Sequence, residues 1–175
     1  MRARKKMRPP PSEHRTTAPG DLMHYDIMFF DKPTPHGCRM SSNFLDDYTS
    51  YKWRFLHATR DARTIRKIFD LFLARIKSIR LQPGNEPMRI ARLRTDNGKE
   101  ITGELMQAFT TENHILPEST APHKPSQNGK AEVTGGNSMT VARSMQITAN
   151  TSDILQGYAI HYGTCIENRP PSSRI

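Results

Sequence analysis

The sequence predicts a mixed α/β domain, because it combines apolar runs typical of buried strands with one segment typical of an amphipathic helix. The first run, residues 22–30 (LMHYDIMFF), is interrupted near its middle by a single carboxylate, Asp26. In residues 61–77, apolar side chains recur every three or four positions and charged side chains take the other face, which is the helical period. Such a helix buries its apolar face against a sheet.

Turn-forming residues separate the remaining elements. Pro33, Pro35 and Gly37 follow the first run, and a Pro-Gly pair in residues 82–85 ends the helix. We expect strands at residues 22–30, 39–47, 52–56, 88–94 and 115–116, and helices at 61–77, 105–109, 131–145 and 152–161. Residues 117–129 contain three prolines, and we expect a loop there. The predicted order is three strands, a helix, a strand, a helix, a strand and then helices.

Length and charge favour one domain preceded by a basic arm. A chain of 175 residues suffices for one domain with its own core. The net charge is +9, and residues 1–20 hold six Lys or Arg, one acid and four prolines. We expect a flexible arm at residues 1–20 and the folded domain at 21–175. The arm could contact phosphates, act as a nuclear signal or be a solvated tail.

Several classes of protein are disfavoured by what the sequence lacks. Cys38 and Cys165 are far apart, with no CxxC pair and no paired His nearby, so neither a disulfide framework nor a zinc site is indicated. No run approaches the roughly 18 apolar residues that span a bilayer, and no apolar signal region follows the N-terminal charges. We therefore expect a soluble, intracellular protein with no membrane partner.

Three carboxylates stand where they could form one metal site. Asp26 lies within a predicted strand, Asp96 directly follows another, and Glu132 begins a predicted helix, with 35 residues between the last two. Converging carboxylates are hard ligands suited to two magnesium or manganese ions, a pair that promotes phosphoryl transfer. Taken singly, each has a structural alternative, since Asp before Asn-Gly commonly forms a turn and a strand Asp can serve only in hydrogen bonds.

The segments around these carboxylates resemble the integrase core of copia-type long-terminal-repeat retrotransposons, within the retroviral integrase and ribonuclease-H-like superfamily. The similar segments are HYD at 24–26, FLDDYT at 44–49, RTDNGKE at 94–100 and TAPHKPSQNGKAE at 120–132, with weaker marks at 142–145 and 168–170. The resemblance covers nearly the whole chain outside the arm. It implies a ribonuclease-H-like fold, a mixed five-stranded sheet flanked by helices.

The resemblance also implies a chemistry. Asp26, Asp96 and Glu132 would be the catalytic residues and would bind two Mg²⁺ or Mn²⁺ ions. Water would trim the 3′ ends of the element, and the new 3′ hydroxyl would then attack target DNA. The partners would be both DNAs and further copies of the chain, in the nucleus.

Other residues acquire expected roles by the same resemblance. Residues 125–130 would form a mobile active-site loop, with an ordinary polar loop as the alternative. Asp46 and Asp47 would be structural, and Trp53 is more typical of a core residue than of a base-stacking platform. The residues expected to contact DNA are Gln127, Asn128, Lys130 and Arg143.

The chain also departs from the family. Gly135 and Gly136 follow Glu132 where the family has basic residues, and each costs a helix roughly 1 kcal/mol relative to Ala. Residues 39–43 are polar for a core strand, no zinc module precedes the core, and the chain stops where relatives continue. A truncated or decayed copy is therefore expected. The alternatives are a non-catalytic nucleic-acid-binding remnant and, less favoured, a hydrolase of RNA–DNA hybrids.

Overall fold

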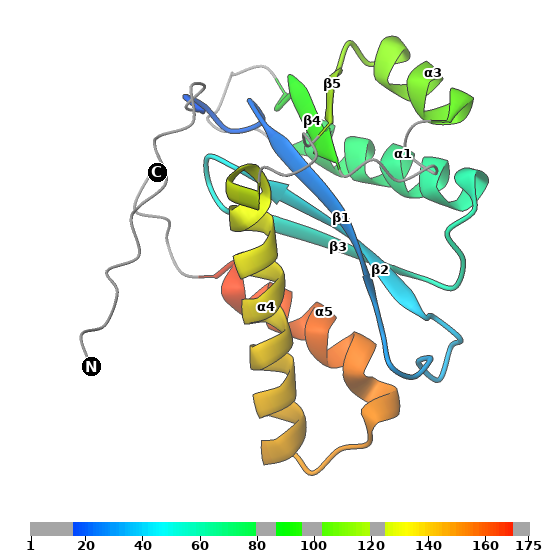
Figure 1. The fold of residues 1–175 in the computed structure, drawn as a ribbon, viewed down its shortest axis with the longest axis vertical. Helices are drawn as coiled ribbons and strands as arrows, with labels where there is room; N and C mark the ends of the chain where they lie inside the picture. Colours follow the sequence, from blue (N-terminus) through cyan, green and yellow to red (C-terminus); the bar gives the residue numbers. More distant parts are fainter. Residues whose placement is uncertain (1–15, 80–86, 96–102, 120–124, 170–175) are drawn as a thin grey trace.

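The computed structural model describes residues 16–79, 87–95, 103–119 and 125–169, with side chains of the last segment described from Asn137 onward. Helices cover both faces of a central sheet (Figure 1). The elements are β1 (Met23–Phe29), β2 (Met40–Asp46), β3 (Lys52–His57), α1 (Ala62–Ser78), β4 (Arg92–Thr95), α3 (Glu104–Glu112), β5 (Leu116–Ser119), α4 (Pro125–Thr148), the 3₁₀ turn η1 (Asp153–Leu155) and α5 (Gln156–Glu167).

The sheet has the strand order β3-β2-β1-β4-β5. Strand β1 pairs antiparallel with β2 and parallel with β4, while β2–β3 is antiparallel and β4–β5 is parallel. This is the mixed five-stranded α/β sheet expected from the sequence, and the predicted fold class is confirmed. Because β1 is central, its two faces are each covered by a different helical layer (Figure 1).

The larger core lies between the sheet and α1 with α3. All six apolar residues of the predicted helical stripe, from Ile65 to Ile76, are buried in α1. Phe72 stacks on Phe44 of β2 with ring centroids 3.8 Å apart, and Trp53 is 9% exposed and belongs to the same cluster, as its predicted core role requires. The Asp61 carboxylate begins α1 by accepting the Thr64 amide, a standard N-cap.

The opposite face of the sheet carries α4 and α5 over a smaller apolar cluster built around Phe30, Ala142 and Ile160. Polar contacts fix the end of α5 there. The Asn168 side chain accepts a hydrogen bond from the Lys52 amide (2.9 Å) and donates one to the Lys52 carbonyl (2.7 Å). It thus satisfies the backbone of edge strand β3 as a residue of a further strand would. This contact explains the position of Asn168 in the fold.

The polar residues of β2 have partners inside the protein. Ser41 and Ser42 are fully buried. The Ser42 hydroxyl lies 3.0 Å from both the Tyr25 hydroxyl and His57 Nε2, and Ser41 donates to Asn43 Oδ1. Buried polar groups are tolerated when they are hydrogen-bonded, so a strand that looked unsuited to a core is accommodated in it.

Several predicted boundaries were wrong. The expected loop 117–129 is shorter, because β5 continues to Ser119 and α4 already begins at Pro125. Proline suits the first turn of a helix, where its missing N–H would have no helical acceptor. The expected strand 88–94 is regular only from Arg92, and the expected helix 152–161 is η1 followed by α5, which ends at Glu167.

The predicted basic arm lies mostly outside the described residues, which begin at Thr16. Its last residues contact the domain: Thr16 donates its hydroxyl proton to Asp47, and the Gly20 amide donates to Asp46. Gly20 has φ +86°, and a Cβ there would lie 2.0 Å from the Arg89 carbonyl oxygen. The close approach of the two backbones therefore requires glycine.

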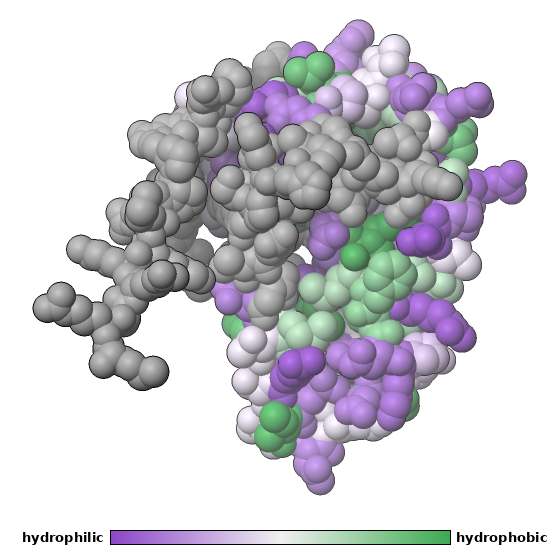
Figure 2. Space-filling view, in the orientation of Figure 1, coloured by the Kyte–Doolittle hydropathy of each residue, from purple (hydrophilic) through white to green (hydrophobic). Residues whose placement is uncertain are grey.

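The described surface is mixed in character. Figure 2 shows apolar residues among hydrophilic ones on one face. Phe29 and Ile147 are among the large apolar side chains that are more than half exposed. Among the described helices none is long and apolar enough to cross a membrane, and both cysteines are free thiols.

We expect Asp46→Asn to destabilise the domain. The fully buried Asp46 carboxylate accepts the amides of Gly20 (2.9 Å) and Thr49 (2.8 Å) and the Thr49 hydroxyl (2.7 Å), and an amide group cannot accept at both of its ends. The expected loss is about 2–3 kcal/mol in urea unfolding. Asp153→Asn, at a 74% exposed side chain paired with Lys32, should cost under about 0.5 kcal/mol. Equal losses for the two variants would contradict a structural role for Asp46.

Candidate active site

Strands β1 and β4 are neighbours in the sheet, and β1 carries Asp26 of the predicted triad. They are parallel neighbours, with Tyr25 paired to Thr95. Asp26 is the next residue of β1, and Thr95 is the last residue of β4, so the chain leaves β4 beside Asp26. Asp96 itself lies outside the described residues.

The side chain of Asp26 projects from the α4 face of the sheet. Strand side chains alternate between faces, and Met23, Tyr25 and Ile27 pack in the α1 core, whereas Met28 packs with the α4–α5 cluster. Asp26 is exposed although it lies on the central strand. The Asp26 carboxylate therefore reaches solvent at the middle of the sheet, unlike the buried carboxylate of Asp46.

Helix α4 crosses the sheet on this same face (Figure 1). Its Ala142 and Met139 belong to the apolar cluster that also includes Met28 of β1, so the helix lies over the strand that carries Asp26. Glu132 lies on α4, seven residues before Met139, and its side chain lies outside the described part. Asp26 therefore lies on β1 and Glu132 on α4, whereas Asp96 follows β4 in the sequence and lies outside the described residues.

His24 occupies the same face as Asp26, two residues earlier on β1. It is 2% exposed, and its Nε2 lies 3.1 Å from Asp47 Oδ1, while its Nδ1 has no hydrogen-bond partner. Asp47 also accepts the Thr16 hydroxyl. These contacts give Asp47 the structural role expected for it, like Asp46 in the neighbouring turn.

A charged network stands beside the site on β4 and β5. Arg92 Nη1 lies 2.9 Å from Glu118 Oε1, and Arg94 Nη2 lies 2.8 Å from Glu118 Oε2. Burial raises the pKa of Glu118, but the hydrogen bonds and charges of Arg94 and Arg92 outweigh it, so the pKa lies below its ordinary value. Arg94 is in register with His24 on one side and Glu118 on the other, which links this network to the row next to Asp26.

Sequence reasoning missed this network. The sequence did contain an indication of it. Arg92 and Arg94 stand at alternate positions of one predicted strand, so they project to the same face and need a counter-charge there. Glu118 fell in the expected loop 117–129, which hid it as the partner.

Comparison with known proteins points to one fold. No family model matches the chain. Among curated proteins it is similar to the retrovirus-related Pol polyprotein from transposon TNT 1-94 of Nicotiana tabacum, at 28% identity over 153 residues, which are 87% of this chain. The chain spans only 11% of that polyprotein's length.

Solved structures agree with that match. The chain superposes on a protein of the simian T-cell lymphotropic virus intasome, determined in complex with the PP2A regulatory subunit B56 gamma (TM-score 0.66, 16% identity, 90% of this chain and 53% of the other). It also superposes on the BIV integrase catalytic core, with a TM-score of 0.65 and 12% identity. This match covers 88% of this chain and 87% of the other. The HTLV-2 integrase catalytic core in complex with magnesium, in a trimeric form, gives 0.61 and 14%, with 86% of each chain covered. The chain has the fold of a retroviral integrase catalytic core.

In this integrase-core fold, the predicted active-site loop at residues 125–130 is instead the first part of α4. Gln127, Asn128 and Lys130 therefore stand on a helix, and their side chains lie outside the described part. Arg143 is exposed further along α4. It is eleven residues beyond Glu132, a separation that returns to nearly the same side of a helix about 16 Å along its axis.

Helix α4 is continuous through Gly135 and Gly136. The sequence marked these glycines as a weak point of about 2 kcal/mol. Close packing against α5 offsets such a cost. Val141 of α4 lies against Gly163 of α5, and a Cβ added at Gly163 would lie 3.3 Å from the Val141 side chain. Helices in proteins depend more on packing than on intrinsic propensity.

Carboxylate oxygens of Asp26, Asp96 and Glu132 would suit magnesium or manganese. Asp26 is the one member of this set whose side chain is described, and no three His, Cys, Asp or Glu come together among the described side chains. The exposure of Asp26 fits a metal ligand.

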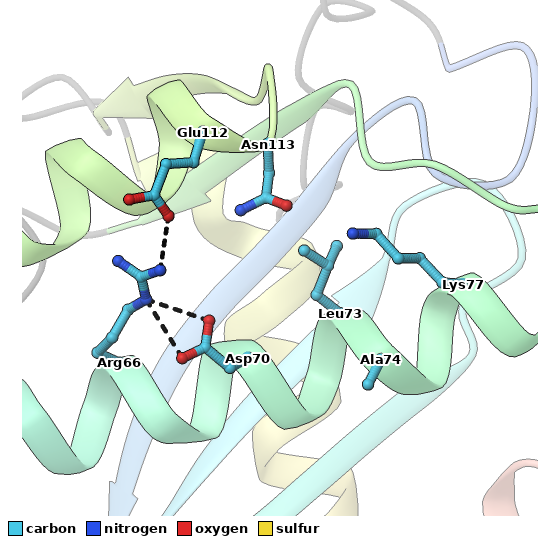
Figure 3. Close-up of a pocket in the computed structure, with 7 residues that line it drawn as sticks. All are labelled: Arg66, Asp70, Leu73, Ala74, Lys77, Glu112 and Asn113. Atoms are coloured by element: carbon cyan, nitrogen blue, oxygen red, sulfur yellow. Dashed lines mark hydrogen bonds and ion pairs between the residues drawn. The ribbon is translucent and has the colours of Figure 1, made fainter.

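A hollow lies on the far side of the sheet, between α1 and the end of α3 (Figure 3). There Arg66 bridges Asp70 (3.1 Å) and Glu112 (2.7 Å). The carboxylates are more than half exposed, and exposed ion pairs of this kind contribute little. The hollow offers no chemistry comparable to that at Asp26.

We expect Glu118→Gln to lower stability in a pH-dependent way. At pH 7 the variant should lose about 1–2 kcal/mol, because the hydrogen bonds to both arginines lose their charge. The folded-state pKa of Glu118 is lowered, so its contribution is complete above the unfolded value of 4.5 and disappears as pH falls through the folded one. Urea unfolding from pH 7 to 3 measures it. Glu112→Gln, at a 56% exposed carboxylate, is the control, and a pH-independent loss in Glu118→Gln would contradict the assignment.

Proposed function

We propose that this chain is the catalytic core of a copia-type retrotransposon integrase, which trims the 3′ ends of element DNA and joins them to target DNA. The carrying observation is Asp26, exposed at mid-sheet beside the end of β4 and on the face crossed by α4. The similarity to the tobacco transposon polyprotein supports the retrotransposon origin. The chain covers a small part of that polyprotein, so the whole activity belongs to the proposal.

Asp26, Asp96 and Glu132 would hold two Mg²⁺ or Mn²⁺ ions. Divalent cations, when bound, supply activation of the attacking oxygen and stabilisation of the leaving oxygen in phosphodiester transfer. The HTLV-2 integrase core, whose structure is in complex with magnesium, supports this choice of ion. The protein's own part is to hold the carboxylates on a rigid sheet, so that water or a 3′ hydroxyl meets the phosphodiester in a fixed orientation.

DNA binding would use the exposed face of α4. Lys130 and Arg143 would contact backbone phosphates, while Gln127 and Asn128 at the helix start would lie nearest the reacting strand. The net charge of +9 favours a polyanionic partner. Oligomerisation and a nuclear site of action belong to the same proposal, and the intasome and the trimeric core among the neighbours support the first of these.

A second candidate function is DNA binding without catalysis. The observation that favours it is the pair Gly135 and Gly136 within α4, because a helix weakened just after Glu132 would hold that carboxylate less firmly. Such a remnant would bind DNA in a salt-sensitive way and show no metal-dependent turnover.

We expect Asp26→Asn and Asp96→Asn each to abolish metal-dependent nicking and strand transfer. Each change removes a charged ligand from the proposed site. Supercoiled plasmid and an oligonucleotide end, with Mn²⁺ or Mg²⁺, provide the two assays. Asp70→Asn, on the far face of the sheet, should behave like the unsubstituted protein. Activity that survives both triad changes would exclude this mechanism, and absence of activity with intact DNA binding would favour the remnant.

We expect Arg143→Ala to reduce the dependence of DNA affinity on salt. Loss of one phosphate contact lowers the slope of log K against log salt by about 1. Fluorescence anisotropy on a labelled duplex between about 50 and 200 mM salt measures this slope. Lys67→Ala, on exposed α1, is the matched control and should leave the slope unchanged. An equal decrease in both variants would indicate a diffuse charge effect rather than an interface on α4.

A further inference from the structure

Arg54 is a buried cation on the same face of the sheet as Asp26. Asp26 of β1 pairs with Asn43 of β2, and Asn43 pairs with Arg54 of β3, so the three side chains form one row across the sheet. The neighbours of Arg54 on β3, Trp53 and Phe55, pack in the α1 core, and Arg54 therefore projects toward α4 and α5. It is 5% exposed.

The guanidinium of Arg54 extends across β2 to β1. Its Nη1 lies 3.6 Å from Met28 Sδ, and Met28 is the next residue after Asp26 on this face of β1. Asn43, which stands between the two charged residues, is engaged with Ser41. Arg54 Nε is buried with no hydrogen-bond partner. The cation thus reaches the strand of the proposed metal ligand without the hydrogen bonds that usually accompany a buried charge.

Two carboxylates, Glu167 and Asp26, exert a favourable charge interaction on Arg54. Among the described residues Arg54 forms no ion pair within 4 Å; burial lowers its pKa to about 10, and the charges of Glu167 and Asp26 oppose this. Glu167 already pairs with Lys52 (3.0 Å) and accepts the Ser138 hydroxyl (2.7 Å). Two cations therefore share one carboxylate at the end of α5, and the excess positive charge acts on Asp26.

We propose that Arg54 is an internal cation that partly neutralises Asp26 and thereby weakens divalent-ion binding at the candidate active site. The inference rests on the proposed function, since it concerns the metal site of that function. A fixed positive charge near a carboxylate favours the metal-free state, because the guanidinium would repel a bound ion. Arg54 itself is buried, and charges inside a protein are screened by salt less than exposed ones.

The consequence is a site that is electrostatically balanced without metal. Converging carboxylates repel one another when no cation is present, and a resident guanidinium relieves that repulsion permanently. Metal binding would then require a higher ion concentration, and exchange of the ion would be easier. Arg54 acts through Asp26 and is a positioning residue, not a catalytic one.

The test compares Mn²⁺ affinity in the full 175-residue chain by counting free Mn²⁺ with electron paramagnetic resonance. Two neutral variants, Arg54→Met and Arg54→Gln, should each bind Mn²⁺ about tenfold more tightly than the unsubstituted protein. Arg54→Lys keeps the charge and should stay within about threefold of it. Having two neutral variants keeps the test valid if one of them fails to fold, and circular dichroism establishes which variants are folded.

Double variants separate this inference from the proposed function. In an Asp26→Asn background, Arg54→Met should give no gain in affinity, because the carboxylate on which Arg54 acts is gone. Equal Mn²⁺ affinity in the folded Arg54 variants and the unsubstituted protein would overturn the inference and leave the proposed function intact. Absence of Mn²⁺ binding in every variant would overturn both, whereas binding in the neutral variants alone would support both.

Discussion

The central place of β1 in the sheet is the constraint on which the rest of the structure depends. Its pairing with β2 on one side and β4 on the other leaves the strand no freedom to slip, because a shift of one residue would exchange its two faces. Tyr25 would then leave its contacts with Phe44 and Phe69, whose ring centroids lie 5.0 and 4.7 Å away. The aromatic core on the α1 side thus determines that Asp26 points to the α4 side.

Fixed polar contacts complete this arrangement where apolar packing is thin. The cluster beneath α4 and α5 is small, and α5 is held instead by Asn168 on the backbone of β3 and by the Lys52–Glu167 pair. Gly157 allows α5 to approach, since a Cβ there would lie 2.7 Å from both Phe30 and Thr34. The layer of α4 and α5 therefore depends on directional polar contacts. Loss of one partner in such a contact leaves the other partner unsatisfied, which costs additional free energy of folding.

Periodicity predicted the fold well because β1 and α1 repeat their apolar residues at the periods of a strand and a helix. The order of elements and the roles of Asp46, Asp47 and Trp53 followed from that pattern and from the resemblance. Prolines misled at residues 117–129, since Pro117 lies within edge strand β5 and Pro125 starts α4, two places where proline is tolerated. Contacts between distant segments, such as Arg94 with Glu118 or Arg54 near Asp26, depend on strand order, which local sequence does not specify.

The candidate site joins two opposing electrostatic demands on one face of the sheet. Carboxylates gathered for metal binding destabilise the metal-free protein through mutual repulsion, whereas cations placed to relieve that repulsion oppose the metal. On the Glu118 side, Arg92 and Arg94 each form a direct ion pair with the carboxylate, which fixes the positions of both cations. On the β3 side, Arg54 is buried and forms no ion pair within 4 Å among the described residues. Under the proposed function, this difference makes Arg54 the cation whose removal should change metal affinity.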